Sequence, residues 1–484
     1  MGIDEAYTVA ISRVLTLSTF DHPPLAWWIA HFAGKFFGES ALALRAPFVL
    51  LSGLTGWLLF VLTRRLFSAE AGFYAVCALA LSPALGLADS IWILPDAPLL
   101  PAMLGCAIFL SRVFFGGKPQ NAPRDWLLAG LCAGLAMLSK YHGVFLFAGA
   151  GLFVLADKRQ RFWLATPWPY LAGLIALIVF SPVLIWNAQH DWVSFLFQSG
   201  RSGPPHLNFL APLALIGLQS LFLAPWIFFP LALLFLRALF SGAALEKDFF
   251  LACLGAVPIL LFTLVAFWSS RRILPHWAAP GYLMILPLLG REIAARIDTG
   301  LAWPRRALIA AAAFTLLGAG AVAALPRLAP PFLAGKHDPL IETVGWTDFV
   351  RAFDARGWRQ KRLFVAATRW LDAGKLDYAL GGDPPVLCLS DDPRGFGIIR
   401  DPQAFVGWDA LIVAPNLTLD QARARLGRHF DAIEPVAPVE ITAGGAPAIR
   451  LDVYRATNFH DPAPEFSLRK AGLAKPPSRS QFNP

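Results

Sequence analysis

Two sets of side chains in this sequence could do chemistry, and they carry opposite charges. The acidic set comprises an adjacent pair near the start of the chain and a residue in the apolar segment LPDAPLL: Asp4, Glu5 and Asp96. The basic set lies in the segments FDHPP, LSKYHG and SSRRILPHW: His22, Lys140, Arg271 and Arg272. Carboxylates and cations brought to one face of a fold would make a pocket for a phosphate group.

Each of these residues also has a simpler interpretation. Asp4 could be an acid favoured by the dipole at a helix N-terminus, and Asp96 could cap a helix just after Pro95. Lys140 and the arginine pair could be interface anchors whose long side chains extend towards water. His22 alone is typical of a turn. Function is favoured only if the elements that carry these groups place them together.

The composition predicts that those elements are membrane-spanning helices. The chain has 484 residues, of which 56% are hydrophobic and 15% charged, and its mean hydropathy is +0.55. A soluble domain carries about 25% charged residues, and apolar runs of about 20 residues match the thickness of a bilayer. The sequence predicts about ten transmembrane helices, at residues 46–63, 71–88, 93–113, 125–139, 142–156, 168–187, 213–238, 249–268, 274–290 and 306–325.

The loops between these spans alternate in charge. One set is rich in cations: Arg64, Arg65, Arg112, Lys118, Arg124, Lys158, Arg159, Arg161, Arg237, Lys247, Arg291, Arg296, Arg305 and Arg306. The other set, which includes the N-terminal segment, holds fewer: Arg13, Lys35, Arg45, Lys140, Arg201, Arg271 and Arg272. The positive-inside rule makes the first set cytoplasmic, so both chain ends and all candidate site residues are expected outside. The net charge of +9 mostly reflects this topology and does not indicate a nucleic-acid partner.

We expect residues 1–326 to form the membrane domain and residues 327–484 a small extracytoplasmic α/β domain with a disordered tail. Within the first, residues 1–45 are predicted as an outer loop of two amphipathic helices on the membrane surface. Tyr7, Ile11, Val14 and Leu15 share the apolar face of the first helix, and Leu25, Ile29, Phe32 and Phe36 that of the second. No signal peptide is expected, because no basic start precedes an apolar core. In the second domain, RLFVAAT, PVLCLS and ALIVAP read as strands, and WTDFVRAFDARG and LDQARARLGRHF as helices.

Cysteine and histidine usage gives no sign of a metal site. Four of the five cysteines lie in apolar helices, where cysteine usually behaves as a small hydrophobe. No CxxC motif or Cys/His cluster occurs, so neither disulfides nor zinc are expected, and no cofactor is predicted.

Five segments in order resemble the membrane glycosyltransferases of family 39, which have the GT-C fold and include protein O-mannosyltransferases and the lipid A aminoarabinose transferase. They are DEAYTVAISRVLTLSTFDHPPLAWWIA, LRAPFVLLSG, LPDAPLL, LSKYHGVFL and SRRILPHWAAPGYLMILP. The resemblance covers about residues 3–300, and DEAY followed by DHPPL is its most specific part. Relatives carry a transmembrane helix ahead of the acidic pair, so a late start codon or a truncated copy would explain the opening MGIDEAY.

The resemblance implies a reaction. A sugar arrives on a polyprenyl phosphate, a glycolipid, lipid A or protein acceptor attacks its anomeric carbon, and the configuration inverts. Asp4 matches the proposed base, with Glu5 beside it, and Asp96 matches the second acidic residue of the family. Such chemistry needs a carboxylate to take a proton and cations beside the leaving phosphate, which suits Lys140, Arg271 and Arg272. Some relatives have lysine where this chain has His22, whose charge depends on its surroundings.

Two other classes remain open. A polytopic lipid or sugar transporter, or flippase, would also carry charges near helix ends, but transporters place ionisable groups near the midplane of the membrane. A membrane scaffold whose working part is residues 327–484 is the third alternative, although that part has no catalytic motif. The sequence therefore favours a glycosyltransferase of a bacterial inner membrane, with the sugar and the acceptor left open.

Overall fold

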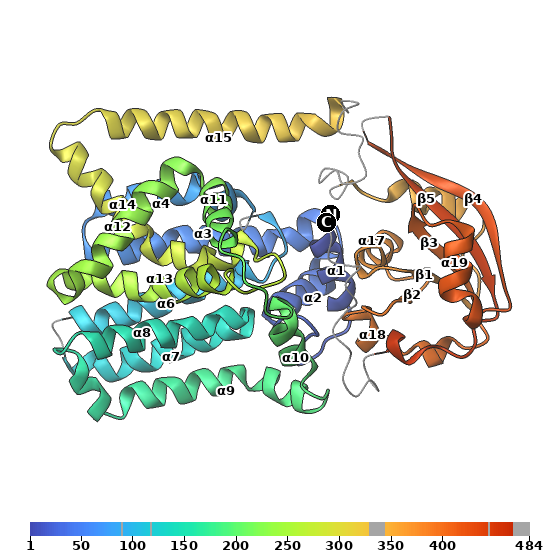
Figure 1. Cartoon of the computed structure of the whole chain (residues 1–484), viewed down its shortest axis with the longest axis horizontal. Helices are drawn as coiled ribbons and strands as arrows, with labels where there is room; N and C mark the ends of the chain where they lie inside the picture. Colours follow the sequence, from blue (N-terminus) through green and yellow to red (C-terminus); the bar gives the residue numbers. More distant parts are fainter. Residues whose placement is uncertain (89–90, 117–118, 329–343, 444–445, 468–484) are drawn as a thin grey trace.

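The computed structural model describes residues 1–88, 91–116, 119–328, 344–443 and 446–467, and it consists of a helical bundle beside a sheet (Figure 1). The tail predicted as disordered lies outside these residues. The α-helices described within residues 1–328 are α1 Ile3–Ser12, α2 Leu25–Phe37, α3 Ala41–Leu66, α4 Ala69–Ala80, α6 Asp96–Phe115, α7 Ala122–Ser139, α8 Phe145–Ala156, α9 Trp168–Ala188, α10 Val193–Ser199, α11 Ala211–Leu223, α12 Pro225–Ser241, α13 Glu246–Val265, α14 Ala279–Asp298 and α15 Trp303–Leu328.

The helices of the bundle approach closely where small residues face each other. A Cβ added to Gly255 of α13 would lie 2.7 Å from the carbonyl oxygen of Gly281 in α14, and the reverse distance is 2.6 Å. Neither position therefore has room for a side chain. Such small-residue contacts let backbones pack closely where the hydrophobic effect cannot drive helices together.

Each predicted span contains a helix, but two of the spans are interrupted. Residues 71–88 hold the end of α4 and, after Leu81 and Ser82, a short π-helix at Pro83–Ala88. Residues 213–238 form two helices, α11 and α12, with a break at Ala224, whose φ is +76°. By length and composition, the stretches long and apolar enough to cross a membrane are Ala41–Leu66, Asp96–Phe115, Trp168–Ala188 and Pro225–Val265, which holds both α12 and α13. The count of about ten spans therefore stays a prediction.

The sheet has five strands in the order β2-β1-β3-β5-β4. The strands are β1 Leu363–Ala367, β2 Val386–Cys388, β3 Asp409–Pro415, β4 Ala432–Ala443 and β5 Ala446–Thr457. β1 is parallel to β2 and β3, whereas β5 is antiparallel to β3 and β4. The three predicted strands and the helices α16 Thr347–Ala355 and α19 Leu419–Leu426 are present, but the β4–β5 hairpin and helix α17 Trp370–Leu380 were not predicted.

All five residues of β1 are buried, as expected for a strand covered on both faces. On one face, Val365 packs in a cluster with Phe349 of α16 and Leu376 of α17. On the other, Phe364 packs against Phe430 and Phe459. The sheet thus has a core of its own on both sides.

The prediction that Tyr7 and Ile11 face the membrane is wrong. Both are 2% exposed, and they belong to the same apolar cluster as α17. A Cβ on Gly374 already meets the backbone of Tyr7 at 2.9 Å. The amphipathic pattern correctly marked one apolar face, but periodicity cannot tell a bilayer from a protein surface, and here α17 supplies the surface. Val14 and Leu15 lie beyond the end of α1 and are exposed.

Polar contacts also fasten α1 to α17. Arg13, which follows α1, forms ion pairs with Asp377 of α17 and with Glu39. The Lys375 ammonium donates to the carbonyl of Met1 at 2.6 Å. The second amphipathic helix, α2, differs because Phe32 and Phe36 on its predicted apolar face are exposed, as contact with lipid would require. The N-terminal segment therefore lies between the bundle and the sheet (Figure 1).

Candidate active site

Glu5 is held by the guanidinium of Arg45 and by two backbone amides. Arg45 Nε donates to its Oε1 at 2.7 Å, the Gly2 amide to its Oε2 at 2.8 Å, and the Ile93 amide to its Oε1 at 3.3 Å. Burial alone would raise the pKa of the Glu5 carboxyl, but Arg45 and these amides hold that pKa below its ordinary value. This geometry is typical of a structural carboxylate that fixes α1 to α3.

Asp96 and Lys140 form a buried ion pair. Asp96 begins α6 and Lys140 follows the last residue of α7, so two helix ends bring them together. The Lys140 ammonium lies 2.9 and 2.8 Å from the two carboxylate oxygens, and the two residues are only 4% and 7% exposed. The structure thus joins a predicted catalytic acid to a predicted phosphate-binding cation.

His22 lies close to this pair. Burial, followed by the charge of Lys140 and then that of Arg201, sets the pKa of its imidazole well below the ordinary value. Its ring stacks on Trp27, and its Nδ1 is buried without a hydrogen-bond partner in the described part of the chain. A neutral imidazole binds an anion through a hydrogen bond and not through charge, which modifies the role predicted for His22.

Asp21, next to His22, lies close to Arg394, which follows strand β2. Tyr7 donates its hydroxyl hydrogen to Asp21 Oδ1 at 3.3 Å, and the guanidinium of Arg394 lies 3.7 Å from Oδ2. Burial raises the pKa of the Asp21 carboxyl, while Arg394 acts in the opposite direction.

Arg394 reaches the site because of the sheet topology. The chain leaves β1 towards Trp370 and leaves β2 towards Arg394 and Gly395, and the carboxyl ends of parallel strands share one edge of a sheet. The Tyr7 ring packs edge-on against Trp370 at 5.0 Å between centroids, and its hydroxyl accepts from the Gly395 amide at 3.1 Å. The edge where an α/β sheet commonly binds its ligand is therefore filled by α1.

Arg201 lies in the 3₁₀ turn Gly200–Ser202 that follows α10. Its guanidinium carbon lies 4.6 Å from the ring centroid of Trp277 and 5.8 Å from that of Phe197. Burial, and then repulsion from Arg394, lower the pKa of Arg201 to about 10. Its side chain has one hydrogen bond, 3.4 Å from Gln198 Oε1, and no ion pair within the described ranges.

Of the remaining predicted residues, some lie near Arg201 and Asp21 and others lie away from them. Asp4 is exposed at the start of α1, and its charge acts on both Asp21 and Arg201. Arg271 lies against Gly203, and its charge acts on Arg201. Arg272 is exposed. The structure therefore gathers Asp4 and Arg271 with Asp21, Arg201 and Arg394, and it leaves Glu5 and Arg272 apart.

Two of these residues were missed by the sequence reasoning for different reasons. Arg201 was placed on the outer face only as a loop cation, and the aromatic Phe197 four residues earlier was the signal that could have raised its rank. Arg394 had no local signal in the sequence, because its place in the site depends on the topology of the sheet.

Within the ranges that the structure describes, no group of His, Cys, Asp or Glu side chains could hold a metal ion.

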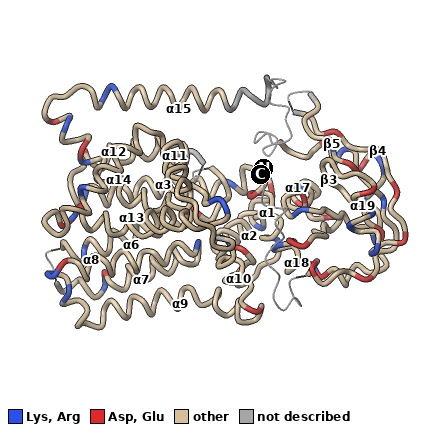
Figure 2. The backbone as a smooth tube through the Cα atoms, viewed as in Figure 1, with Lys and Arg blue, Asp and Glu red and all other residues tan. Residues whose placement is uncertain are grey.

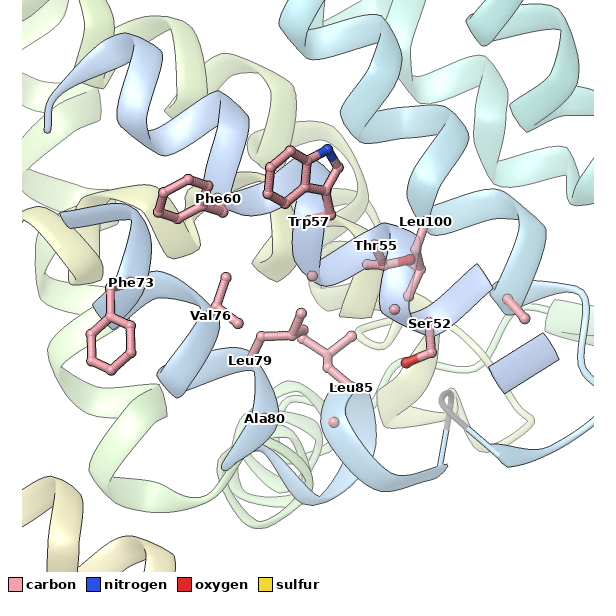
Figure 3. Close-up of a pocket in the computed structure, with 14 residues that line it drawn as sticks. Ser52, Thr55, Trp57, Phe60, Phe73, Val76, Leu79, Ala80, Leu85 and Leu100 are labelled. Carbon is pink, nitrogen blue, oxygen red and sulfur yellow. The ribbon is translucent and has the colours of Figure 1, made fainter. Parts of the chain in front are cut away.

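A cavity of about 470 Å³ opens between α3 and α4 (Figure 3). It is mostly apolar, with Trp57 and Phe60 of α3 and Phe73 of α4 on its walls. Ala97 and Leu100 of α6 also line it, and Ala97 follows Asp96 directly. The cavity can accommodate hydrocarbon and has no group that could act as an acid or a base.

Residues 21–186 match the family described as dolichyl-phosphate-mannose-protein mannosyltransferase. The chain is 25% identical to the lipid A galacturonosyltransferase RgtD of Rhizobium johnstonii over 284 residues, 58% of each chain. It is 25% identical over 289 residues to the undecaprenyl phosphate-alpha-4-amino-4-deoxy-L-arabinose arabinosyl transferase of Edwardsiella ictaluri, covering 57% of this chain and 50% of that protein. The chain thus spans between half and three fifths of the length of these two relatives.

Among solved structures, the chain is similar to ArnT from Cupriavidus metallidurans. The TM-score is 0.61 both with the apo form and with the form bound to undecaprenyl phosphate, at 16% and 15% identity. The alignments cover 94% and 96% of this chain and 93% and 94% of ArnT. This likeness shows the GT-C fold, and together the matches confirm the resemblance to family 39 that the sequence motifs indicated.

Proposed function

We propose that this chain, with its GT-C fold and its resemblance to the family 39 enzymes, transfers a sugar from a polyprenyl-phosphate carrier to an acceptor. The observation that carries the proposal is the environment of Arg201. This guanidinium is stacked between aromatic rings next to Asp4, Asp21 and Arg271, and it has only one weak hydrogen bond in the described structure.

A phosphate is the ligand that suits Arg201 best. A guanidinium has five N–H donors in a planar fork, and a buried donor without an acceptor destabilises the protein. A phosphate offers oxygens that such a fork can bind in pairs, with Arg271 close enough to add a second charge. Lys140, predicted for this role, is already paired with Asp96 and would have to exchange that partner to contact the donor.

We assign the role of general base to Asp4. It is exposed, so an acceptor can reach it, and it lies within electrostatic range of Arg201, where the donor phosphate would bind. In the proposed step the acceptor oxygen bonds to the anomeric carbon, the bond from that carbon to the phosphate oxygen breaks, and the acceptor proton passes to Asp4. Attack from the side opposite the phosphate inverts the configuration.

The carrier and the orientation follow from the bundle. The apolar cavity beside Asp96 offers a place for the hydrocarbon of the carrier (Figure 3). Lysines and arginines gather at the end of the bundle away from the sheet (left in Figure 2). The positive-inside rule then supports an extracytoplasmic site. The charged site residues lie at one end of the bundle, which favours transfer over transport.

Sugar transfer and donor binding should be measured in proteoliposomes with a labelled polyprenyl-phosphate sugar. We expect Arg201→Gln to lower donor affinity by at least about tenfold, since it removes a charged hydrogen bond. Arg272→Gln is the matched control, because this arginine is exposed, and it should change affinity less than about threefold. Equal donor affinity in both variants would remove phosphate binding from Arg201. Movement of the intact donor across the bilayer without transfer would favour the transporter.

A further inference from the structure

Gln198, in the last turn of α10, uses both ends of its side-chain amide. Its Nε2 donates to the backbone carbonyl of Asp21 at 2.5 Å, and its Oε1 accepts from the guanidinium of Arg201 at 3.4 Å. The first hydrogen bond is short and the second is long. One side chain thus connects the turn that carries Asp21 with the cation to which we assign the donor phosphate.

The amide of Gln198 has one favourable orientation between these two partners. An amide has a donor end and an acceptor end. In the reverse orientation its NH2 group would face the N–H groups of Arg201, and its oxygen would face the carbonyl of Asp21. Among side chains of similar length, an ionised glutamate has no donor, a lysine has no acceptor, and a methionine has no donor and only a weak acceptor. Glutamine is therefore the side chain of this length that serves both partners.

The rest of α10 fixes the turn side of this connection. The Ser194 hydroxyl donates to the carbonyl of Thr19 at 3.0 Å, and the ring centroids of Phe197 and Phe20 lie 4.8 Å apart. Residues three and four apart lie on the same face of a helix, so Ser194, Phe197 and Gln198 all face the N-terminal segment, beside which α10 lies (Figure 1). The backbone of the turn therefore has a defined place relative to α10.

Aromatic rings fix the other side only in part. The guanidinium carbon of Arg201 lies 4.6 Å from the ring centroid of Trp277. An aromatic face restrains the plane of a guanidinium more than its rotation within that plane. A hydrogen bond from one N–H group to Gln198 restrains this rotation and leaves the other N–H groups of the fork to bind a ligand.

We propose that Gln198 is a positioning residue for the donor, which orients the fork of Arg201 towards the phosphate and holds it at a fixed place relative to the turn of Asp21. The inference rests on the proposed function, in which Arg201 binds the donor phosphate. Gln198 acts through Arg201 and does not contact the reacting atoms. Without the amide, Arg201 would have to be ordered when the donor binds, and that ordering lowers affinity.

The first test measures binding of polyprenyl phosphate without a sugar to the full chain in proteoliposomes, because this probe carries the group that Arg201 binds. Gln198→Met keeps the length of the side chain and loses both hydrogen bonds, so we expect Kd to rise by about three- to tenfold. Gln198→Glu should raise Kd further, because its carboxylate competes with the phosphate for Arg201. Gln189→Met is the matched control, since Gln189 is exposed near the start of the same connecting segment, and it should leave Kd unchanged.

The kinetics of transfer distinguish positioning from a structural role. With the labelled donor of the transfer assay, Gln198→Met should raise KM and leave kcat unchanged for the folded enzyme. A structural role would instead lower the amount of folded enzyme, and with it the apparent kcat, at an unchanged KM. That result would overturn the inference.

A double-mutant cycle tests whether Gln198 acts through Arg201. In the background of Arg201→Gln, Gln198→Met should cause no further loss of affinity for polyprenyl phosphate. Equal losses in both backgrounds, or wild-type affinity in Gln198→Met, would overturn the inference and leave the proposed function intact. If Arg201→Gln itself does not weaken binding, the proposed phosphate site is wrong and the inference fails with it. Gln198→Glu runs the same cycle if Gln198→Met does not fold.

Discussion

The surroundings of Glu5 and those of Arg394 show two ways of burying a charge. The Glu5 carboxylate accepts hydrogen bonds from one guanidinium and two backbone amides, at donor–acceptor distances of 2.7–3.3 Å. Around Arg394, the nearest carboxylate oxygens lie at 3.5 and 3.7 Å, which is longer than a good hydrogen bond, and Nε is buried without a partner in the described chain. Helix α1 contacts both regions, through Glu5 itself and through Tyr7, whose hydroxyl meets Asp21 and the Gly395 amide.

This difference in hydrogen bonding distinguishes structural from functional charged residues better than charge or burial alone. A buried ion that the fold satisfies contributes to a single arrangement of the chain, and removing its partner is costly. A buried ion that the fold leaves unsatisfied destabilises the protein until a ligand arrives. By this criterion the Glu5 region joins α1 to α3, and the region of Arg201 and Arg394 is the one that we propose as a binding site.

The largest effect should come from Asp4, the acid nearest the binding site that stays accessible. Asp4→Asn keeps the size of the side chain and removes the base, so we expect the transfer rate to fall by at least about a hundredfold. Donor binding should be retained, because Arg201 and Arg271 are unchanged. Transfer and binding measured on the same preparation would separate the two. A normal transfer rate with asparagine at position 4 would remove Asp4 from the reaction and leave the base to be sought elsewhere.

Glu5→Gln should have a smaller effect on the rate and a clear effect on stability. The change leaves Arg45 without its partner, which costs about 3 kcal/mol for a buried pair, and the melting temperature should fall. The folded fraction should transfer sugar within a few-fold of wild type. Glu5→Gln combined with Arg45→Met should be less destabilised than the sum of the single changes. A variant that is stable but inactive would place Glu5 in the reaction and break the comparison between the two regions.

The smallest effect should be a difference in how stability depends on pH. His22 has an ordinary pKa of 6.5 and a folded pKa well below it. As pH falls below about 6.5, the unfolded chain takes up a proton that the folded chain refuses, so stability decreases by at most about 1.4 kcal/mol per pH unit. His22→Gln should reduce this decrease between pH 7 and 5 without abolishing it, because burial also lowers the pKa of His429. Melting temperatures across this range, in one detergent, would measure it.

The contribution of Glu5 to stability should change in a lower pH range than that of His22. The folded pKa of Glu5 lies below its ordinary value of 4.5, so its contribution to stability is present above that pH and is lost as the pH falls through the folded pKa. Between pH 7 and 5, Glu5→Gln should therefore keep the slope of the wild type. An unchanged slope in His22→Gln would mean that His22 does not govern acid sensitivity.

The sequence by itself determined a helix in each predicted span, three of the five strands and several residues of the candidate site. Hydrophobic periodicity and run length are local properties, so they predicted a helix in every span, as well as β1, β2 and β3. The motifs DEAY and DHPP marked the segment that carries Asp4, Asp21 and His22. LPDAPLL and LSKYHG each supplied one member of the Asp96–Lys140 pair, although neither segment shows that the two residues meet.

Only the tertiary structure decided which charges are satisfied and which are available. The fold gives Glu5 its partner Arg45 from α3 and sets Tyr7 against α17, away from the membrane side where its pattern had placed it. It also brings Arg394 from the edge of the sheet to Asp21. These pairings join residues far apart in the chain, and a periodic pattern records which face of an element is apolar but not which surface covers it. The physical reason is that a hydrogen bond depends on tenths of an ångström, which packing sets and composition does not.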